Sequence, residues 1–281
     1  MRRFLRIFRI IVLMKGLKIA VLVKQVTDTR ETVEAKVGAD GTIDRNALPA
    51  ICNPDDLNAL EQALRLKDRI AGSRVVLISM GPQRAEEVLR DGIYRGADEG
   101  ILLSDRRFAG ADTMATSYAL AMAARKIEPD LILAGRQSID GDTAHVGPQT
   151  AQWLGWPQVT YAEQITPCED GRLEIRRISD DEVQTVRTTL PAVVTVGGSG
   201  AAECRPCNVC RILDYKKQPV TVWTADDLGG DMARYGLSGS PTQVVDSRTI
   251  VAQHKDTEWI AADEESLSDF VARLVESHIV E

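Results

Sequence analysis

The chain has 281 residues, of which 44% are hydrophobic and 27% are charged. These fractions are typical of a globular protein, and the length suffices for one large α/β domain with an appendage or for two small domains. The net charge of −7 argues against a nucleic-acid partner, and no apolar run approaches the ~20 residues of a transmembrane helix. The five cysteines are an odd number in a chain without a secretory signal, so we expect a reducing compartment, the cytoplasm.

Residues 1–14 differ in composition from the rest of the chain. The first thirteen, MRRFLRIFRIIVL, include four arginines and no acidic residue. We expect this extension to be disordered or to result from a translation start upstream of the natural one at Met14. A transit peptide or a basic amphipathic helix on a membrane surface is the alternative.

Strands and helices alternate along the next part of the chain. Continuous apolar runs predict buried strands, and amphipathic patterns predict helices. The expected strands are 18–24, 75–80, 100–104 and 130–134, and the expected helices start near Pro54, at 83 and at 111. Asn53 or Asp55 is expected to cap the first helix, and Asp40-Gly41 predicts a small hairpin. This alternation specifies an α/β fold with a doubly wound, mostly parallel sheet.

The pattern changes after Pro157. Alternating runs at 159–165, 172–178 and 183–189 predict an antiparallel excursion, and the apolar run at 190–196 is expected to rejoin the buried sheet. Periodicity is lost from Gly197 until a helix expected at 266–278. A long tail of this kind usually wraps another chain. We therefore expect an α/β domain at 15–197 and a C-terminal partner-wrapping arm at 198–281.

One segment, residues 131–149, predicts a nucleotide site. A buried strand ends at Gly135, a loop rich in Asp and Gly follows, and Gly147-Pro148 begins a helix. Backbone N–H groups at a helix start bind anions, and ligands bind at the carboxyl ends of parallel strands, as in Rossmann-like folds. Asp140 and Asp142 would repel a phosphate unless they contact ribose hydroxyls or cap the helix. Met80 would form an apolar wall for adenine.

The remaining chemistry of the chain is sparse. No GxSxG or HExxH motif accompanies the three histidines, so we expect no catalytic residue. Two interpretations of His145 stay open: it contacts a ligand, or it is a solvent-exposed residue at the start of a helix. Cys204, Cys207 and Cys210 resemble half of a metal or cluster site, but structural zinc needs four ligands. Cysteines in a surface loop, without metal, are the favoured interpretation.

Several motifs together resemble those of the β (small) subunit of electron transfer flavoproteins, from about Leu17 to beyond Val251. They are VLVKQV at 21–26, Asn53-Pro54, Met80-Gly81-Pro82, RGAD at 95–98, GRQSIDGD at 135–142, LPAVVT at 190–195 and Lys216-Lys217. The resemblance implies a heterodimer with a larger α subunit that carries a redox-active FAD. It also implies that this subunit binds AMP, or FAD in the electron-bifurcating and nitrogen-fixation-associated branch. Residues 104–117, 140–148 and 239–242 resemble that second branch, so FAD is favoured.

The resemblance also implies which residues border the nucleotide. They are Leu22, Asn53, Pro54, Asp55, Asp56, Met80, Gly135, Arg136, Gln137, Ser138, Ile139, Asp140, Gly141, Asp142, Thr143, Ala144, His145 and Val146. Four further residues are expected beside the flavin ring and ribityl chain: Ala111, Asp112, Thr113 and Thr116. The cofactor would supply the redox chemistry, so the chain is expected to be an electron carrier and not a stand-alone enzyme.

The partners implied are the α subunit, NADH or dehydrogenases as electron donors, and ferredoxin or a quinone-linked oxidoreductase as electron acceptors. In the most specific form of this hypothesis the flavin bifurcates electrons, sending one to a high-potential and one to a low-potential acceptor. Dehydrogenases are expected to dock near Glu203–Leu213, where Val209 stands in place of the family's Leu anchor, and His145 stands where the family usually has Gln. The alternatives are a non-bifurcating subunit with structural AMP, an ATP-splitting enzyme, and a nucleotide-sensing module. Residues 24–28, KQVTD, lack the Ser-Gly-Gly phosphate loop of the ATP-splitting class, and the long arm favours an obligate partner over a sensor.

Overall fold

The computed structural model describes residues 15–28, 50–168, 171–179, 182–197, 202–243 and 257–280. The chain divides into two compact units, Met1–Val244 and Val245–Glu281. Residues 1–14 and the hairpin expected at Asp40-Gly41 lie outside the described residues. Among the helices that the structure describes, none has the length and apolar character needed to cross a bilayer.

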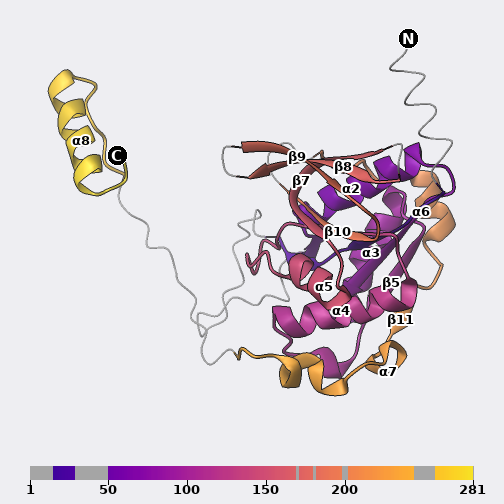
Figure 1. Ribbon diagram of the computed structural model, residues 1–281. Helices are drawn as coiled ribbons and strands as arrows, with labels where there is room; N and C mark the ends of the chain where they lie inside the picture. The colour runs from indigo at the N-terminus through magenta and orange to yellow at the C-terminus, as the bar shows by residue number, and fades with distance from the viewer. Residues whose placement is uncertain are drawn as a thin grey trace, which may run out of the picture. The chain divides into compact units, whose positions relative to one another are not determined.

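A nine-stranded sheet, counted over the described residues, forms the centre of the first unit (Figure 1). Its order is β11-β5-β4-β1-β6-β10-β7-β8-β9. The strands from β11 to β7 run parallel, and β8 and β9 are antiparallel to their neighbours. The strands are β1 (Lys18–Leu22), β4 (Arg74–Met80), β5 (Glu99–Leu103), β6 (Leu131–Gly135), β7 (Gln158–Pro167), β8 (Leu173–Ser179), β9 (Glu182–Thr188), β10 (Ala192–Val196) and β11 (Thr221–Trp223). The predicted α/β class, the antiparallel excursion and the return of 190–196 to the sheet are confirmed.

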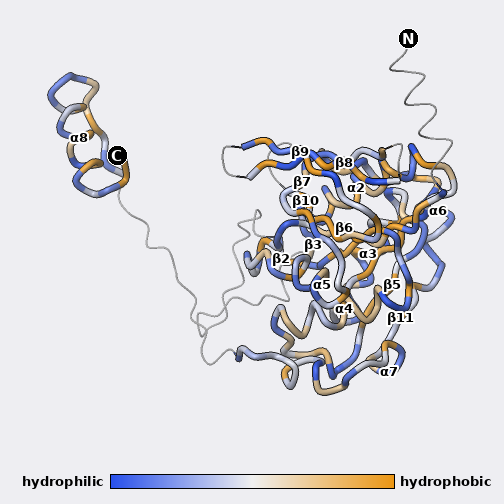
Figure 2. Tube along the Cα trace, viewed as in Figure 1, coloured by the Kyte–Doolittle hydropathy of each residue, from blue (hydrophilic) through white to orange (hydrophobic). Residues whose placement is uncertain are grey.

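Helices cover both faces of this sheet. Strand side chains alternate between two cores, since Ile19 and Val21 pack with Leu60 of α2, whereas Ala20 packs with Ala119 of α4. The first face carries α2 (Pro54–Arg69) and α3 (Glu86–Arg95), and the second carries α4 (Thr113–Ile127) and α5 (Val146–Leu154). Every residue of β6 and β10 is buried, and Figure 2 shows hydrophobic residues gathered along the central strands. Burial on both faces explains why these strands appear in the sequence as continuous apolar runs.

The strand order reverses between β1 and β6. From β1 the chain adds β4 and β5 on one side, and then β6 and β10 on the other. The carboxyl ends of β1 and β6 therefore mark the point at which open α/β sheets bind ligands. A separate two-stranded sheet, β2 (Gln25–Thr27) with β3 (Ala50–Cys52), leads from β1 to the start of α2.

The first unit extends beyond the boundary expected after residue 197. β11 pairs with β5, and two short helices, α6 (Val209–Tyr215) and α7 (Ala225–Leu228), lie in the segment for which the sequence predicted no strong helix. These elements are too short to show a periodic pattern, and tertiary contacts stabilise them.

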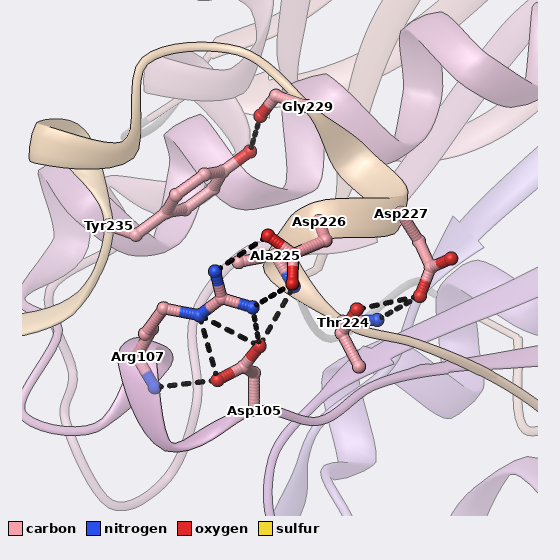
Figure 3. Close-up of polar contacts among 8 residues, drawn as sticks. All are labelled: Asp105, Arg107, Thr224, Ala225, Asp226, Asp227, Gly229 and Tyr235. Carbon is pink, nitrogen blue, oxygen red and sulfur yellow. Dashed lines mark hydrogen bonds and ion pairs between the residues drawn. The ribbon is translucent and has the colours of Figure 1, made fainter.

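One such contact joins α7 to residues 105–107, which follow β5 (Figure 3). The Nη1 and Nη2 of Arg107 each lie 2.8 Å from an oxygen of Asp226, and Arg107 also bonds to Asp105. Further along, the Tyr235 hydroxyl donates to the Gly229 carbonyl at 2.6 Å. The second unit contains α8 (Glu264–Glu276), and none of the described residues of this helix is buried.

Candidate functional site

Asn53 joins the start of α2 to the loop that follows β6. Its side chain is fully buried. Nδ2 donates to the Gln137 carbonyl at 2.8 Å, and Oδ1 accepts from the Ile139 N–H at 3.1 Å. Asn53 occupies the N-cap position of α2, but among the described residues no side chain caps this helix. The expectation that Asn53 or Asp55 is a capping side chain was wrong, because the loop takes the Asn53 amide.

Asp56, in the first turn of α2, connects the ends of the two strands at the reversal point. Its Oδ2 accepts from the Lys24 N–H at 2.9 Å, just past β1, and its Oδ1 accepts from the Gly135 N–H at 3.0 Å, at the end of β6. Burial raises the pKa of Asp56 to about 7, and the bonds from Asn53, Lys24 and Gly135 oppose that rise. A Cβ on Gly135 would lie 2.3 Å from Asp56 Oδ1, so this approach requires glycine.

The two acids of the loop have partners within the protein. Lys24 Nζ lies 2.7 Å from Asp140 Oδ1, and Gln137 Nε2 donates to Asp142 Oδ1 at 2.9 Å. Asp142 and Ala144 adopt left-handed conformations, with φ of 49° and 54°. The ammonium group of Lys24 offsets the charge of Asp140 and removes part of the repulsion that a phosphate would otherwise meet, whereas the neutral Gln137 amide does not offset the charge of Asp142.

Three of the helices that begin at this edge, α2, α4 and α5, differ in how they would receive an anion. α2 carries Asp55 and Asp56 in its first turn. α4 is capped by Asp112, whose carboxylate accepts from the Met114 and Ala115 N–H groups. The first turn of α5, which the structure describes in full, has no acidic residue, and the His145 side chain makes no capping bond there. The helix dipole and the absence of first-turn acidic residues therefore favour an anion at α5 over α2 and α4.

Most of the predicted site residues lie around this edge. Leu22 and Met80 end β1 and β4, and Pro54 begins α2. Burial raises the pKa of Asp55, and the Gln137 N–H and the charge of Arg136 partly oppose this rise. The half-buried or exposed loop residues complete the group: Arg136, Gln137, Ser138, Ile139, Asp140, Gly141, Asp142, Thr143, Ala144, His145 and Val146.

The four residues expected beside a flavin ring form a second group at the start of α4. Thr113 and Thr116 lie in its first turns, next to Ala111 and Asp112. Asp112 Oδ2 accepts from the Thr242 hydroxyl at 2.8 Å, and the Asp112 N–H donates to Ser240 Oγ at 2.9 Å. These hydrogen bonds join Asp112 to the segment before residue 244, not to the loop 136–146.

Two residues at this edge were missed by the sequence reasoning. Lys24 is one, because nothing local indicates that it pairs with Asp140. Tyr161 is the other. The guanidinium of Arg136 lies 5.5 Å from the centre of its ring, and Tyr161 has a left-handed φ of 59° at the irregularity in the pairing of β7 with β10. A non-glycine residue with this conformation was the signal, but it is visible only in the structure.

The cysteine segment lies on α3. Cys207 Sγ donates to Asp91 Oδ1 at 3.2 Å, and Arg95 Nη1 donates to the Arg205 carbonyl at 2.8 Å. Among the described residues, no group of three or more His, Cys, Asp or Glu side chains is placed to hold a metal. Val209 and Leu213 of α6 are 68% and 74% exposed. The segment expected to dock a partner therefore presents two apolar side chains to solvent.

Comparison with known proteins gives a consistent result. Residues 40–228 match the electron transfer flavoprotein domain family. The electron transfer flavoprotein subunit beta of Clostridium acetobutylicum is 41% identical over 94% of this chain and all of its own length. Subunit CarD of the caffeyl-CoA reductase-Etf complex of Acetobacterium woodii is 42% identical over the same shares. Protein FixA of Azorhizobium caulinodans is 43% identical over 80% of this chain and 82% of its own.

Proposed function

The chain belongs to the electron transfer flavoprotein family as a beta subunit, and we propose that it works in a heterodimer with the larger alpha subunit. Its role there is to bind an adenine nucleotide cofactor and to take part in electron transfer. The observation that carries this proposal is the double connection made by α2. Asn53 holds the loop after β6, and Asp56 holds the ends of β1 and β6.

The residues at this edge fit an adenine nucleotide. Gly135 lets the start of α2 pack closely against the end of β6, and Asp140 is paired with Lys24. The first turn of α5 is free of acidic side chains. We propose that Leu22 and Met80 flank the adenine, that Asn53, Pro54, Asp55 and Asp56 border it, and that loop 135–146 with the start of α5 holds the phosphate.

We propose FAD as the nucleotide, with Ala111, Asp112, Thr113 and Thr116 beside its ring and ribityl chain. Support comes from the sequence motifs at 104–117 and 140–148 and from relatives whose names place them in a caffeyl-CoA reductase-Etf complex or as FixA. A flavin bound here would supply the exchange of one or two electrons, and the protein would set its orientation and surroundings. Structural AMP, with the redox FAD confined to the alpha subunit, is the alternative.

The electron partners follow from the same reasoning. We propose NADH or a dehydrogenase as electron donor and ferredoxin or a quinone-linked oxidoreductase as electron acceptor. The most specific form of the proposal is electron bifurcation, and the proposed location is the cytoplasm. Dehydrogenase docking is proposed at Glu203–Leu213. In support, Val209 and Leu213 are exposed, and Arg211 fastens α6 to α3 by donating to the carbonyls of Ile93 and Ala97. A pre-formed docking element loses less entropy on binding.

The decisive experiment is to co-express the chain with its alpha subunit and to count the extracted cofactors. Two FAD per heterodimer is the expected result. One FAD with one AMP would select the alternative and would exclude a redox role for this subunit. A heterodimer with neither flavin nor AMP in this subunit would contradict the proposed site.

A further inference from the structure

Lys24 spans the reversal point of the sheet. Its backbone is fixed, because its N–H donates to the buried Asp56 carboxylate at 2.9 Å. Its side chain extends to the other side of the reversal point. Nζ lies 2.7 Å from Asp140 Oδ1 and 3.3 Å from Ser138 Oγ, both in the loop after β6. Lys24 therefore has a rigid base beside β1 and a flexible, charged end among the residues proposed to hold the nucleotide.

The pair with Asp140 can be exchanged at little cost. The side chains of Lys24 and Asp140 are 48% and 41% exposed, and ion pairs with this exposure contribute little stability. An ammonium group has three N–H donors, and the contacts with Asp140 and Ser138 use two of them. A phosphate carries at least as much negative charge as a carboxylate and offers more acceptor oxygens, so it would compete well for the same ammonium group.

The charge distribution around the loop indicates which ligand group Lys24 would meet. Asp142 is occupied by Gln137, and the start of α5 lacks acidic residues. Burial alone would raise the pKa of Asp140, but the bonds from Lys24 and Ser138 outweigh it and hold that pKa below its usual value. Asp140 is therefore a charged competitor for Lys24 at neutral pH.

We propose that Lys24 is a phosphate-binding residue of this site and that Asp140 holds its ammonium group in place until a nucleotide phosphate takes over. This inference rests on the proposed nucleotide-binding function. In this inference Lys24 binds the nucleotide phosphate, and Asp140 competes with that phosphate for the Lys24 ammonium group and so lowers the affinity for the nucleotide. Neither role involves chemical change in the ligand.

The test compares AMP with adenosine, which lacks the phosphate. Both are titrated calorimetrically into the full-length heterodimer after removal of bound nucleotide, in about 50 mM salt, where exposed charges are weakly screened. Lys24→Met keeps the length of the side chain but removes its charge. We expect AMP affinity to fall about tenfold, the size of one charge-assisted hydrogen bond, and adenosine affinity to stay within about twofold.

Asp140→Asn provides the opposite change. If Asp140 competes with the phosphate, this variant should bind AMP several-fold more tightly, and the gain should vanish in the Lys24→Met background. Lys67→Met is the matched control. Lys67 Nζ lies 2.6 Å from Asp98 Oδ1, a similar ion pair at the other end of α2, and its loss should leave both affinities unchanged.

Three results would overturn the inference while leaving the proposed function intact. They are an unchanged AMP affinity in Lys24→Met, an equal loss for AMP and adenosine, and a weaker AMP affinity in Asp140→Asn. The last two would mean that the pair only holds the loop in shape. If the unmodified heterodimer bound neither AMP nor FAD in this subunit, the proposed function itself would fail and the inference with it.

Discussion

Asn53 and Gln137 are 84 residues apart in the sequence, yet Nδ2 of the first lies 2.8 Å from the carbonyl oxygen of the second. Asn53 Oδ1 also accepts a hydrogen bond from the Ile139 N–H, so the buried side-chain amide of Asn53 bonds to the backbone at two positions of the loop after β6. A buried amide with both of its functions used fixes the backbone of the loop more firmly than a solvent-exposed side chain would.

Replacing Asn53 should therefore damage the loop more than the helix. We expect Asn53→Ala to weaken nucleotide binding about tenfold, because the partly buried Gln137 carbonyl and Ile139 N–H lose their partner. The helical signal in circular dichroism should be nearly unchanged, since this side chain does not cap α2. Asn208→Ala is the control, because Asn208 does cap its helix, α6. Equal nucleotide affinity in Asn53→Ala and the unmodified protein would contradict the assignment.

Asp56 should make the stability of the first unit depend on pH. Its pKa is about 7 when folded, against 3.8 as the ordinary value. The folded state thus binds more protons between about pH 4 and pH 7, and the free energy of unfolding should decrease as pH rises through that window. Urea unfolding at several pH values, compared with Asp56→Asn, measures this contribution. The advantage of the unmodified protein over the variant should shrink toward neutral pH.

A difference that stays constant or grows over that range would contradict the pKa assigned to Asp56. Asp56→Asn should be less stable at every pH tested. The two carboxylate oxygens of Asp56 accept hydrogen bonds from the N–H groups of Lys24 and Gly135. In the variant, the amide nitrogen of Asn would face one of these N–H groups and could not accept its bond.

The shape of the loop should depend on Asp142. Asp142→Ala removes the bond from Gln137 and places alanine in a left-handed conformation, which costs roughly 1 kcal/mol. We expect the nucleotide of this subunit to dissociate about tenfold faster, while the flavin of the alpha subunit is retained. Asp142→Asn is the control, since Asn tolerates this conformation and its side-chain oxygen can accept the same bond. Stopped-flow release of the nucleotide distinguishes the two variants, and identical rates would contradict the prediction.

Asp112 should contribute to stability through both of its carboxylate oxygens. One accepts from the first N–H groups of α4 and the other from Thr242, so Asp112→Ala should lower the free energy of unfolding by about 1–2 kcal/mol. Thr242→Val removes only the hydroxyl contact and should cost less. Burial would raise the pKa of Asp112, but the bonds from Ala115 and Thr242 outweigh it and lower that pKa below 3.8.

The effect of Asp112→Ala should therefore be complete above about pH 4 and should decline at lower pH, as the folded carboxyl becomes protonated. Chemical denaturation at pH 7 and below pH 4 measures both values. An effect that is the same at both pH values would contradict the role given to the charged carboxylate.

The three clustered cysteines should differ in reactivity. Cys210 is exposed, whereas Cys204 and Cys207 are half-buried. Burial raises the pKa of Cys204 to about 11, and burial together with the bond to Asp91 raises that of Cys207. Because the thiolate is the reactive form, N-ethylmaleimide at pH 7.5 should label Cys210 first, as followed by peptide mass spectrometry. Cys210→Ser should remove the fast phase, and rapid labelling of Cys204 would contradict the prediction.

The sequence indicated the position of the loop but not its internal contacts. Gly135, Asp140 and Asp142 mark a polar turn after a buried strand, and that is a local signal. The same local reasoning made Asn53 a capping residue, since an Asn before Pro and two acids is a usual helix start. Its true partners lie in the loop after β6, a strand that comes to lie beside β1 only when the sheet has formed.

Local periodicity predicted the long strands and helices and the α/β class of this protein. A strand buried on both faces forms a continuous apolar run, and a helix buried on one face shows a regular apolar repeat. The tertiary structure decided which distant residues meet. Lys24 and Asp140 lie 116 residues apart, and β11 reaches β5 from the aperiodic segment. Such contacts depend on strand order and on the approach of loops in space, which no repeat along the sequence encodes.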